Sequence, residues 1–452
     1  MSFKLSKEYL VNIKEAVKKD DKDFLKAEFN EIYAADIAQV FDELETEEAI
    51  YLYSLLSKEE GAEVLMQMDE DTRESFLELI SSQEIAEGLV DNLDSDDAAD
   101  LLNELSDEKK SEVISKIRDS EQASDIVELL RYDEDSAGGL MAKELMKANL
   151  DWNVFECLRE LRKQAEKLEK VYTVYVVDNE NILKGVLPLK NLLLVPTKTE
   201  IASIMNHDVI AVQASKHKEE VAALMEKYDL ETLPVVDELG RLLGRITIDD
   251  VVDIIKEEAE KDYQLLSGVS SNVESSDNAL TLVKARLPWI LIGMLGGIVS
   301  SRVISIYEPE LQIHPEMAIF IPLIAATGGN VGVQSSSLIV RAIANDDLSH
   351  LDLGAKLLKE FTVGLMNALV CSGVVFIYNL LFSDSFALSI TVSIALLVVI
   401  IFAALFGTFF PLMLHRQKID PALATGPFIT TTNDIIGIFI YFIIGRLLYG
   451  VF

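Results

Sequence analysis

The chain has 452 residues, half of them hydrophobic, and a formal net charge of −35 at pH 7. The acidic excess lies in the first part, where 33 Lys and Arg stand against 65 Asp and Glu before residue 287, compared with 7 against 10 after it. A surface this acidic attracts cations and repels nucleic acid, which excludes a nucleic-acid-binding role. The length of the chain indicates about three domains.

The start of the chain and its two cysteines bear on the cellular compartment. The first residues, MSFKLSKEYL, lack the basic region and apolar core of a signal peptide, so we expect a cytosolic N-terminus. Cys157 and Cys371 fall on opposite sides of the change in composition. We therefore expect neither a disulfide nor a thiolate metal site.

Residues 1–131 contain an internal repeat at intervals of 24 or 25 residues. Similar stretches begin at Leu44, Met68, Leu93 and Ile117, and each unit reads as two short amphipathic helices. The pattern predicts an all-α acidic domain of stacked helical repeats. Acids crowd between positions 91 and 100, where divalent cations would relieve their repulsion, although a solvated acidic scaffold explains most of them one by one.

Residues 132–256 open with the glycine-bearing break YDEDSAGGLM and then show a second duplication, with an offset of 59 residues. Each copy alternates helical patterns with short β-branched runs, which predicts an α/β fold. The matched pairs are Met146 with Met205, Val177 and Asp178 with Val236 and Asp237, Gly185 with Gly244, and Asn191 with Asp250. The duplication resembles a pair of CBS domains, and GRITIDDVVDII is typical of the end of the second.

The resemblance to CBS domains implies a nucleotide site in the second copy. Thr247 and Asp250 keep the spacing of the hydroxyl and acid that commonly hold an adenosyl nucleotide such as ATP in these pairs. The first copy lacks a hydroxyl at the matching position and has Asn191 in place of the acid. ATP binding and a pure dimer scaffold therefore remain alternatives.

Acids crowd again where this domain leads to the membrane, on a predicted helix that continues into a connecting helix at residues 257–283. Like charges at this helical spacing destabilise a helix unless a bound cation or water compensates them. Two acidic clusters in separate domains favour a shared divalent ion. The acids are Asp249, Asp250, Asp253, Glu257, Glu258, Glu260 and Asp262.

Residues 284–452 contain five apolar stretches, each long enough to cross a bilayer core of about 30 Å. They cover residues 287–306, 317–344, 361–382, 386–414 and 426–449. The loops on one side hold Lys284, Arg286, Arg341, Lys356, Lys359, Arg416 and Lys418, and those on the other side hold no Lys or Arg. The positive-inside rule predicts a multi-pass protein of the plasma membrane, with cytosolic N-terminal domains and the C-terminus outside.

The second apolar stretch, PLIAATGGNVGVQSSSLIVR, holds several polar and small residues. Gly328 and Gly329 would permit close helix packing, which is a structural explanation for the glycines. Asn330 and Gln334 lie one helical turn apart, and their amides need partners in hydrocarbon. This requirement favours a water-lined face.

The fifth stretch places Asp434 well inside the membrane, after Pro427, Thr430 and Thr431. An intramembrane carboxylate marks a functional site by default, with a structural partner such as Arg302 as the alternative. Pro427 removes a backbone hydrogen bond and frees a carbonyl. In a twofold dimer, two Asp434 side chains would match the charge of one divalent cation.

The ligand chemistry favours Mg²⁺, which prefers oxygen ligands and sheds water reluctantly. The sequence shows no paired His or Cys ligands of the kind that suit zinc or copper. This chemistry leaves Co²⁺, Ni²⁺ and Mn²⁺ open.

Four motifs, YDEDSAGGLM, ITIDDVVDII, GGNVGVQSS and DPALATGPFITTTND, resemble the bacterial MgtE family of magnesium channels in the same order along essentially the whole chain. The resemblance implies a homodimer in the lipid bilayer with a pore at the dimer interface and Asp434 as the acid of the ion site. It also implies that cytosolic Mg²⁺, bound between the N-terminal, CBS and connecting-helix regions, closes the channel. It assigns the sensor role to Asp249, Asp250, Asp253, Glu257 and Glu258, and also to Glu59, Asp91 and Asp94.

Three other functions are compatible with parts of the pattern. The same fold would serve another divalent ion, coupled transport or efflux. A nucleotide-sensing membrane receptor would use the CBS pair and have little need for Asp434. An enzyme is the least supported class, because the membrane part has no nucleophile, base and orienting group at interpretable spacing.

Overall fold

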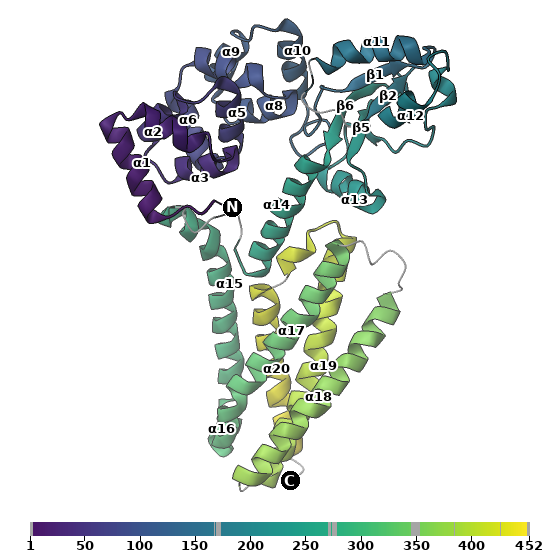
Figure 1. Cartoon of the computed structure of the whole chain (residues 1–452). Helices are drawn as coiled ribbons and strands as arrows, with labels where there is room; N and C mark the ends of the chain where they lie inside the picture. The colour runs from purple at the N-terminus through teal and green to yellow at the C-terminus, as the bar shows by residue number, and fades with distance from the viewer. Residues whose placement is uncertain are drawn as a thin grey trace. The chain divides into compact units, whose positions relative to one another are not determined.

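The computed structural model describes residues 3–166, 168, 173–269, 273, 278–344, 353–383, 385–424 and 426–449. The chain divides into two compact units, Met1–Ile255 and Lys256–Phe452 (Figure 1). The first unit holds a helical part and an α/β part. The second holds the long apolar helices.

The helical part of the first unit is a stack of short helices around an apolar core that includes Phe41, Leu52, Phe76 and Leu89, all fully buried. It confirms the predicted all-α repeat domain. The helices are α1 (Lys7–Lys19), α2 (Lys22–Phe29), α3 (Ala34–Asp42), α4 (Thr46–Tyr53), α5 (Lys58–Met66), α6 (Glu70–Leu79), α7 (Ser82–Glu84), the π-helical η1 (Ile85–Leu89), the 3₁₀-helical η2 (Val90–Asn92), α8 (Ser95–Asn103), α9 (Asp107–Ile114) and α10 (Ser120–Leu129).

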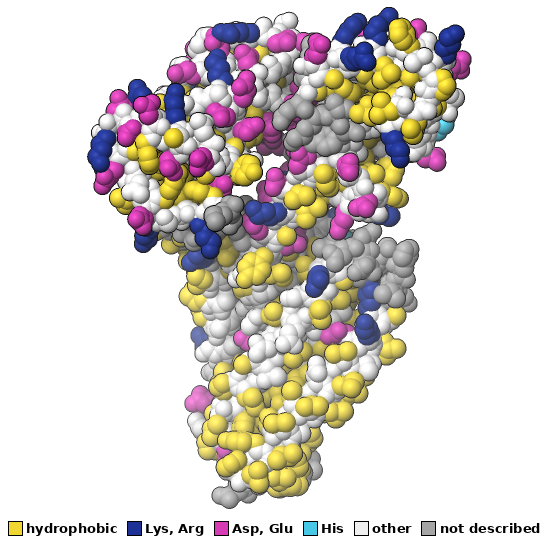
Figure 2. Space-filling view, viewed as in Figure 1, with side chains coloured by type: hydrophobic (Ala, Val, Ile, Leu, Met, Phe, Trp, Pro, Cys, Tyr) yellow, Lys and Arg dark blue, Asp and Glu magenta, His cyan; other side chains and the backbone are white. Residues whose placement is uncertain are grey.

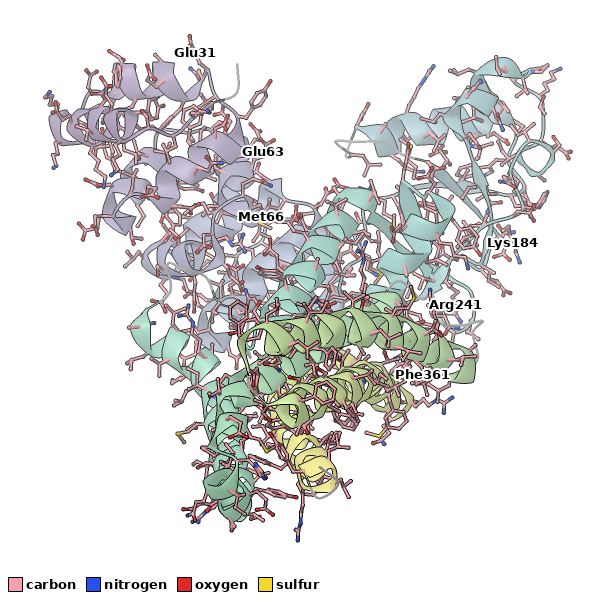
Figure 3. All side chains as sticks on the ribbon, turned by 90° about the horizontal axis from the view of Figure 1, so that it is seen from below. Glu31, Glu63, Met66, Lys184, Arg241 and Phe361 are labelled. Atoms are coloured by element: carbon pink, nitrogen blue, oxygen red, sulfur yellow. The ribbon has the colours of Figure 1, made fainter. Side chains whose placement is uncertain are left out.

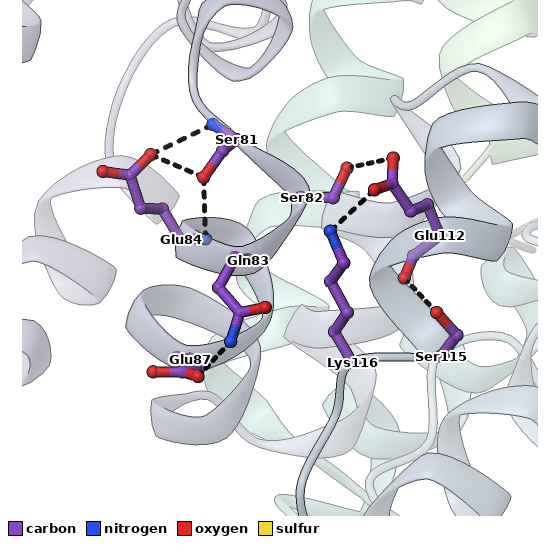
Figure 4. Close-up of polar contacts among 8 residues, drawn as sticks. All are labelled: Ser81, Ser82, Gln83, Glu84, Glu87, Glu112, Ser115 and Lys116. Atoms are coloured by element: carbon purple, nitrogen blue, oxygen red, sulfur yellow. Dashed lines mark hydrogen bonds and ion pairs between the residues drawn. The ribbon is translucent and has the colours of Figure 1, made fainter.

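Serine and glutamate side chains form reciprocal caps at the starts of α5 and α7 and also join α7 to a neighbouring helix (Figure 4). At α7, Ser81 Oγ accepts a hydrogen bond from the Glu84 N–H, and Glu84 Oε2 accepts one from the Ser81 N–H at 3.1 Å. Ser82 Oγ donates to Glu112 Oε2 at 2.8 Å, which links α7 to α9. The reciprocal cap of Ser81 and Glu84 satisfies N–H groups that a helix start leaves without partners, so the local sequence defines where α7 begins.

The α/β part contains two three-stranded sheets with the same topology. In each, the first strand pairs in parallel with the second and the second antiparallel with the third. The duplication confirms the CBS pair. The strands are β1 (Met146–Asn149), β2 (Val174–Val177), β3 (Leu183–Leu187), β4 (Val212–Gln213), β5 (Thr232–Val236) and β6 (Leu242–Thr247), and the helices are α11 (Val154–Ala165), α12 (Leu189–Leu194), η3 (Ile201–Ser203) and α13 (Lys218–Tyr228).

The turns after β2 and β5 show the 59-residue offset in atomic detail. Asp178 Oδ1 accepts the N–H groups of Glu180 and Ile182, and Asp237 Oδ1 accepts those of the residues 59 positions later, Leu239 and Arg241. These backbone bonds, together with Lys184, lower the pKa of Asp178. Lys184 and Arg241, both labelled in Figure 3, pair with the aspartate of their own copy.

The offset holds only from the second strand of each copy onward, and matching Met146 with Met205 was wrong. Met205 packs where a Cβ on Gly185 would lie, at 2.9 Å from its Sδ, and Met141 packs in the same way on Gly244, also at 2.9 Å. Met141 is therefore the counterpart of Met205. The first copy has a longer connection between α11 and β2 than the second has between α13 and β5, and this insertion changes the offset.

The second unit contains five helices long and apolar enough to cross a membrane, which confirms the predicted five-helix domain. Hydrophobic side chains cover much of their visible surface (Figure 2), and α19 is the most buried of the five. The spans are α15 (Ala279–Ile306), α17 (Ile321–Ala344) with the preceding η4 (Pro315–Phe320), α18 (Leu353–Phe382), α19 (Phe386–Arg416) and α20 (Pro427–Tyr449); α16 (Glu308–Ile313) and η5 (Pro421–Ala424) are short.

The acidic helix α14 (Ile248–Leu266) begins directly after β6 and ends in the second unit. The sequence predicted a connecting helix at residues 257–283. Within the described residues, α14 covers the first part of that range and α15 begins at Ala279. The remainder of the range includes residues 270–272 and 274–277, which lie outside the described residues.

Candidate functional site

Helices α17 and α20 approach each other closely through glycines. A Cβ atom on Gly329 would lie 3.1 Å from Thr430 Cγ2 and 3.4 Å from Asp434 Oδ1. A Cβ on Gly328 would meet Val399 of α19 at 3.1 Å, and one on Gly332 would collide with Asn433. Small residues therefore bring the backbone of α17 against Asp434, as close helix packing in membranes requires.

Asp434 itself has a buried carboxylate oxygen. Among the described residues, Asp434 Oδ1 has no hydrogen-bond partner, and neither polar atom of Asn433, which is 1% exposed, has one. Arg302, the structural partner considered from the sequence, forms no ion pair with Asp434 in the described part of the chain. A buried carboxylate without a partner is costly, so the site fits a cation or its hydration water as the missing partner.

The threonines near the start of α20 have different roles. Thr430 donates both its N–H, at 3.1 Å, and its hydroxyl, at 3.0 Å, to the Gly426 carbonyl. Thr431 packs against Gly296 of α15. Pro427 is the first residue of the helix, a position where its missing N–H costs nothing. Of the predicted pore residues, the structure thus gathers Gly329, Thr430 and Asp434.

Asn330 and Gln334 lie on the exposed side of α17, one turn apart. Their exposed position places them apart from the packed Gly329–Asp434 contact. Two exposed amides on a membrane helix require water or a second protein surface, since lipid offers no hydrogen bonds.

One acid among the membrane helices was not singled out from the sequence. Glu360 of α18 accepts a hydrogen bond from Ser335 Oγ of α17 at 2.6 Å, and Ser335 is buried. The apolar stretch was expected to begin at residue 361, but α18 begins at Leu353, so Glu360 lies inside the helix. The sequence signal that could have identified Glu360 was its position directly before an apolar stretch.

In the first unit, acids from separate segments form a cluster that we call the acidic junction: Asp94, Asp96, Asp97, Glu144 and Asp250. One carboxylate oxygen each of Asp94, Asp96 and Glu144 lie within 4.8 Å of one another, a spacing that one divalent cation can bridge. Glu144 is fixed by Ser95, whose N–H and hydroxyl donate to Glu144 Oε2 at 3.1 and 2.7 Å. Arg245 lies at the junction, with its Nη2 3.5 Å from Asp94 Oδ2.

The junction carries more negative charge than its one arginine compensates. Burial, followed by the charges of Asp97, Asp250 and Asp94, raises the pKa of Asp96 well above its usual value. Burial and the charges of Asp250, Asp94 and Asp249 raise the pKa of Asp97 to about 6. Such perturbed carboxylates fit a site that a divalent cation completes.

The predicted sensor residues other than Asp94 lie on three helices, α14, η2 and α5. Asp249 and Asp250 lie in the first turn of α14 and act electrostatically on Asp97. Asp253, Glu257 and Glu258 follow along the same helix, and Glu258 pairs with Lys261 at 3.2 Å. Asp91, in η2, has a buried carboxylate oxygen without a partner among the described residues, and Glu59 is exposed in the first turn of α5.

Glu144 was not predicted from the sequence because it stands 50 residues after Asp94, and its neighbours in the chain resemble an ordinary loop.

Thr247 and Asp250, the predicted nucleotide pair, contact each other. The Thr247 hydroxyl donates to Asp250 Oδ2 at 2.5 Å. Burial raises the pKa of Asp250, and this hydrogen bond opposes the shift. The pair lies where β6 leads into α14, and through Asp250 it belongs to the acidic junction.

We expect the first unit to become less stable as pH rises when divalent cations are absent. The folded-state pKa of Asp97, about 6, is above the ordinary 3.8, so the stability it contributes is complete below 3.8 and is lost as pH rises through about 6. Thermal unfolding of the purified chain in chelator, between about pH 5 and about pH 8, should show a loss on the order of 2 kcal/mol. Added Mg²⁺, or Asp97→Asn, should flatten the profile; an unchanged slope in Asp97→Asn would contradict this assignment.

Comparison with protein families identifies three regions. A family model described as a divalent cation transporter, MgtE, matches residues 321–444. A model of the MgtE intracellular N domain matches residues 32–135, and a CBS-domain model matches residues 201–257. These regions coincide with the membrane helices, the helical repeats and the second CBS copy.

The similarity to known proteins extends over almost the whole chain. The magnesium transporter MgtE of Thermus thermophilus is 35% identical over 442 residues, 97% of this chain and 98% of that protein. The magnesium transporter MgtE of Enterococcus faecalis is 36% identical over 317 residues, 70% of each chain. A solved structure described as the cytosolic domain of the Mg²⁺ channel MgtE in complex with ATP is 36% identical, covers 54% of this chain and 99% of its own, and aligns with a TM-score of 0.51.

Proposed function

Because this chain belongs to the MgtE family of magnesium transporters, we propose that it is an Mg²⁺ channel whose pore lies at the interface of a homodimer and contains Asp434. The observation that carries the proposal is the buried, unpartnered Asp434 oxygen beside Gly329 and Thr430. An acid in this setting attracts a divalent cation such as Mg²⁺, which prefers oxygen ligands.

The exposed side of α17 supports a dimeric pore. Asn330 and Gln334 lie on this side, and their amide groups need hydrogen-bond partners that lipid chains do not offer. A twofold axis beside α17 would turn this side into a water-lined wall shared by two protomers. Two Asp434 carboxylates would then supply two negative charges to one Mg²⁺.

The acidic junction supports regulation by cytosolic Mg²⁺. With its sites filled, the acids of different segments no longer repel one another, and the compact arrangement that closes the channel is favoured. When Mg²⁺ falls, repulsion separates them. A ligand shifts such an equilibrium only by its different affinity for the two states, and bridging carboxylates supply that difference.

The positive-inside pattern supports insertion in the plasma membrane with the acidic domains in the cytosol and the C-terminus outside. Lys284 and Arg286 lie near the start of α15, and Arg416 is the last residue of α19, which puts these charges on the cytosolic side in the proposed orientation. In this orientation the regulatory domains are exposed to the Mg²⁺ concentration of the cytosol, the compartment into which Mg²⁺ is taken up.

The test is Mg²⁺ uptake by the intact chain in liposomes carrying a trapped indicator, with Mg²⁺ varied on the side of the cytosolic domains. Uptake that falls as Mg²⁺ on this side rises is the expected result. No uptake by a folded chain would refute the channel proposal. Competition by Co²⁺, Ni²⁺ and Mn²⁺ in the same assay decides ion preference.

We also propose that the CBS pair binds ATP, since the cytosolic domain of the related Mg²⁺ channel was solved in complex with ATP. Thr247 and Asp250 are the residues expected to contact the nucleotide, through a hydroxyl and an acid at the appropriate spacing. Calorimetry of the chain with millimolar ATP should show binding, weakened severalfold or more in Thr247→Ala because one hydrogen bond is lost. No heat in the intact chain would remove the proposal.

A further inference from the structure

Helices α17 and α19 pack backbone against backbone at one point. A Cβ on Gly407 of α19 would lie 2.4 Å from the Gly332 carbonyl oxygen of α17. The two helices run in the same direction, because α18 lies between them in the chain and returns across the bundle (Figure 1). Arg341 and Arg416 each stand nine residues after one of these glycines. The two arginines therefore lie at the same end of the bundle, each about 13 Å along its helix from the glycine contact.

Helix α18 brings two lysines to the same end. A Cβ on Gly364 of α18 would lie 3.0 Å from Ala404 Cβ of α19, and α18 runs in the opposite direction to α19. Lys356 stands eight residues before Gly364, and Arg416 twelve residues after Ala404. Their levels along the bundle therefore differ by about one helical turn, or about 6 Å, and Lys359 lies within a turn of Lys356. We call these four side chains the basic rim: Arg341, Lys356, Lys359 and Arg416.

The acids nearest to the basic rim in the described part of the chain are engaged elsewhere. Glu360 of α18 accepts the Ser335 hydroxyl at 2.6 Å, and Asp420 accepts the Ala422 N–H at 2.8 Å. Among the described residues, no acid forms an ion pair with any side chain of the rim. Lys and Arg side chains are visible near the upper end of α18 (Figure 2). The rim therefore offers its positive charges to a partner outside the described chain.

The length of α18 places the rim at the level of the lipid headgroups. The helix has 30 residues, whereas a bilayer core of about 30 Å takes about 20 residues. The apolar stretch 361–382 fills the core, so Lys356 and Lys359 lie just outside it. Leu358, between these lysines, is 67% exposed, and Phe361, labelled in Figure 3, is 39% exposed. An exposed apolar surface thus continues directly from the charged one.

We propose that the basic rim binds an anionic phospholipid, with the lipid phosphate at Arg341, Lys356 and Arg416 and the acyl chains along α18 beside Phe361. Arginine and lysine are the usual donors to phosphate, and basic pockets between membrane helices hold anionic headgroups. An acidic protein segment would match the charge, but it has no acyl chains to cover the apolar surface. The proposal is independent of regulation by Mg²⁺, and the proposed orientation places the lipid in the cytosolic leaflet.

The test measures lipid binding to the full chain in neutral detergent by native mass spectrometry, with phosphatidylglycerol as the anionic probe and phosphatidylcholine as the zwitterionic one. Inorganic phosphate is added as a competitor, to distinguish a lipid headgroup from a free anion. The test variant is Arg341→Gln with Arg416→Gln. The matched control is Lys284→Gln with Arg286→Gln, which removes the same number of charges from two exposed residues near the start of α15.

We expect the wild type to prefer phosphatidylglycerol, and the test variant to bind it about tenfold more weakly, because each cationic side chain near an anionic headgroup contributes to binding. The control should bind like the wild type, and inorganic phosphate at the lipid concentration should displace little lipid. If the test variant does not fold, Lys356→Gln with Lys359→Gln removes two charges of the rim from α18 alone and should show a similar loss.

Three results would overturn the proposal. Equal binding of both lipids by the wild type would mean that the rim does not select an anionic headgroup. Equal losses in the test variant and the control would mean that total charge attracts the lipid. Complete displacement by inorganic phosphate would mean that the rim holds a free anion.

Discussion

Asp434→Ala should abolish Mg²⁺ uptake, lowering the rate by about 100-fold or more, since one charge interaction at short range in a protein site is worth on the order of 3 kcal/mol. Asp434 Oδ1 is buried without a partner among the described residues and lies beside Gly329, so no neighbouring group replaces it. Uptake into liposomes and into magnesium-starved cells measures the effect.

Two further variants test why uptake is lost. One separates the loss of charge from the loss of side-chain volume, and the other tests whether any substitution of an acid in the membrane helices has the same effect. Asp434→Asn keeps the size of the side chain and should also fail. Glu360→Gln removes the acid of α18, but its amide oxygen still accepts the Ser335 hydroxyl, so most uptake should remain. Robust uptake by folded Asp434→Ala would exclude Asp434 as the pore acid.

The combined change Asp96→Asn with Glu144→Gln should remove most of the response to cytosolic Mg²⁺, reducing the ratio of uptake at low and high Mg²⁺ at least severalfold. Both side chains offer oxygens to the same candidate ion position, and losing charged ligands weakens a divalent site strongly. The ratio is the informative measurement, because neutral side chains also relieve repulsion and alter uptake at low Mg²⁺.

The matched control for the acidic junction is Glu63→Gln, an exposed acid of α5 that is labelled in Figure 3. It removes one negative charge, against two in the junction variant, from the helical part that also holds Asp96, and it does not touch Asp94 or Glu144, so its response to Mg²⁺ should equal that of the wild type. An equal loss in both proteins would show that total charge, and not the junction, senses Mg²⁺.

The sequence predicted the type of each domain because each type follows from local spacing. The helical repeats were predicted from apolar residues at helical intervals and from caps such as Ser57 and Ser81. The membrane spans were predicted from the length of uninterrupted apolar sequence, and the CBS pair from the duplicated strand pattern. The error in pairing Met146 with Met205 arose where an insertion shifted the register. Constant spacing cannot reveal such a shift.

The sequence singled out Asp434, since a carboxylate within an apolar stretch stands out, but the predicted roles of the individual pore and sensor residues remain to be tested. Contacts between distant segments had no local signal. The approach of Glu144 to Asp96, the Ser335–Glu360 bond and the close packing of Gly268 against Pro427 were visible only in the folded chain.

For this protein, then, the sequence alone determined the domain types, the membrane spans and the family, because these depend on periodicity and composition along the chain. The tertiary structure decided which acids share a site and which glycines bring helices together, because those depend on packing between residues far apart in sequence. Burial and mutual repulsion, which raise the pKa of Asp97 to about 6, arise only once folding has brought those charges together.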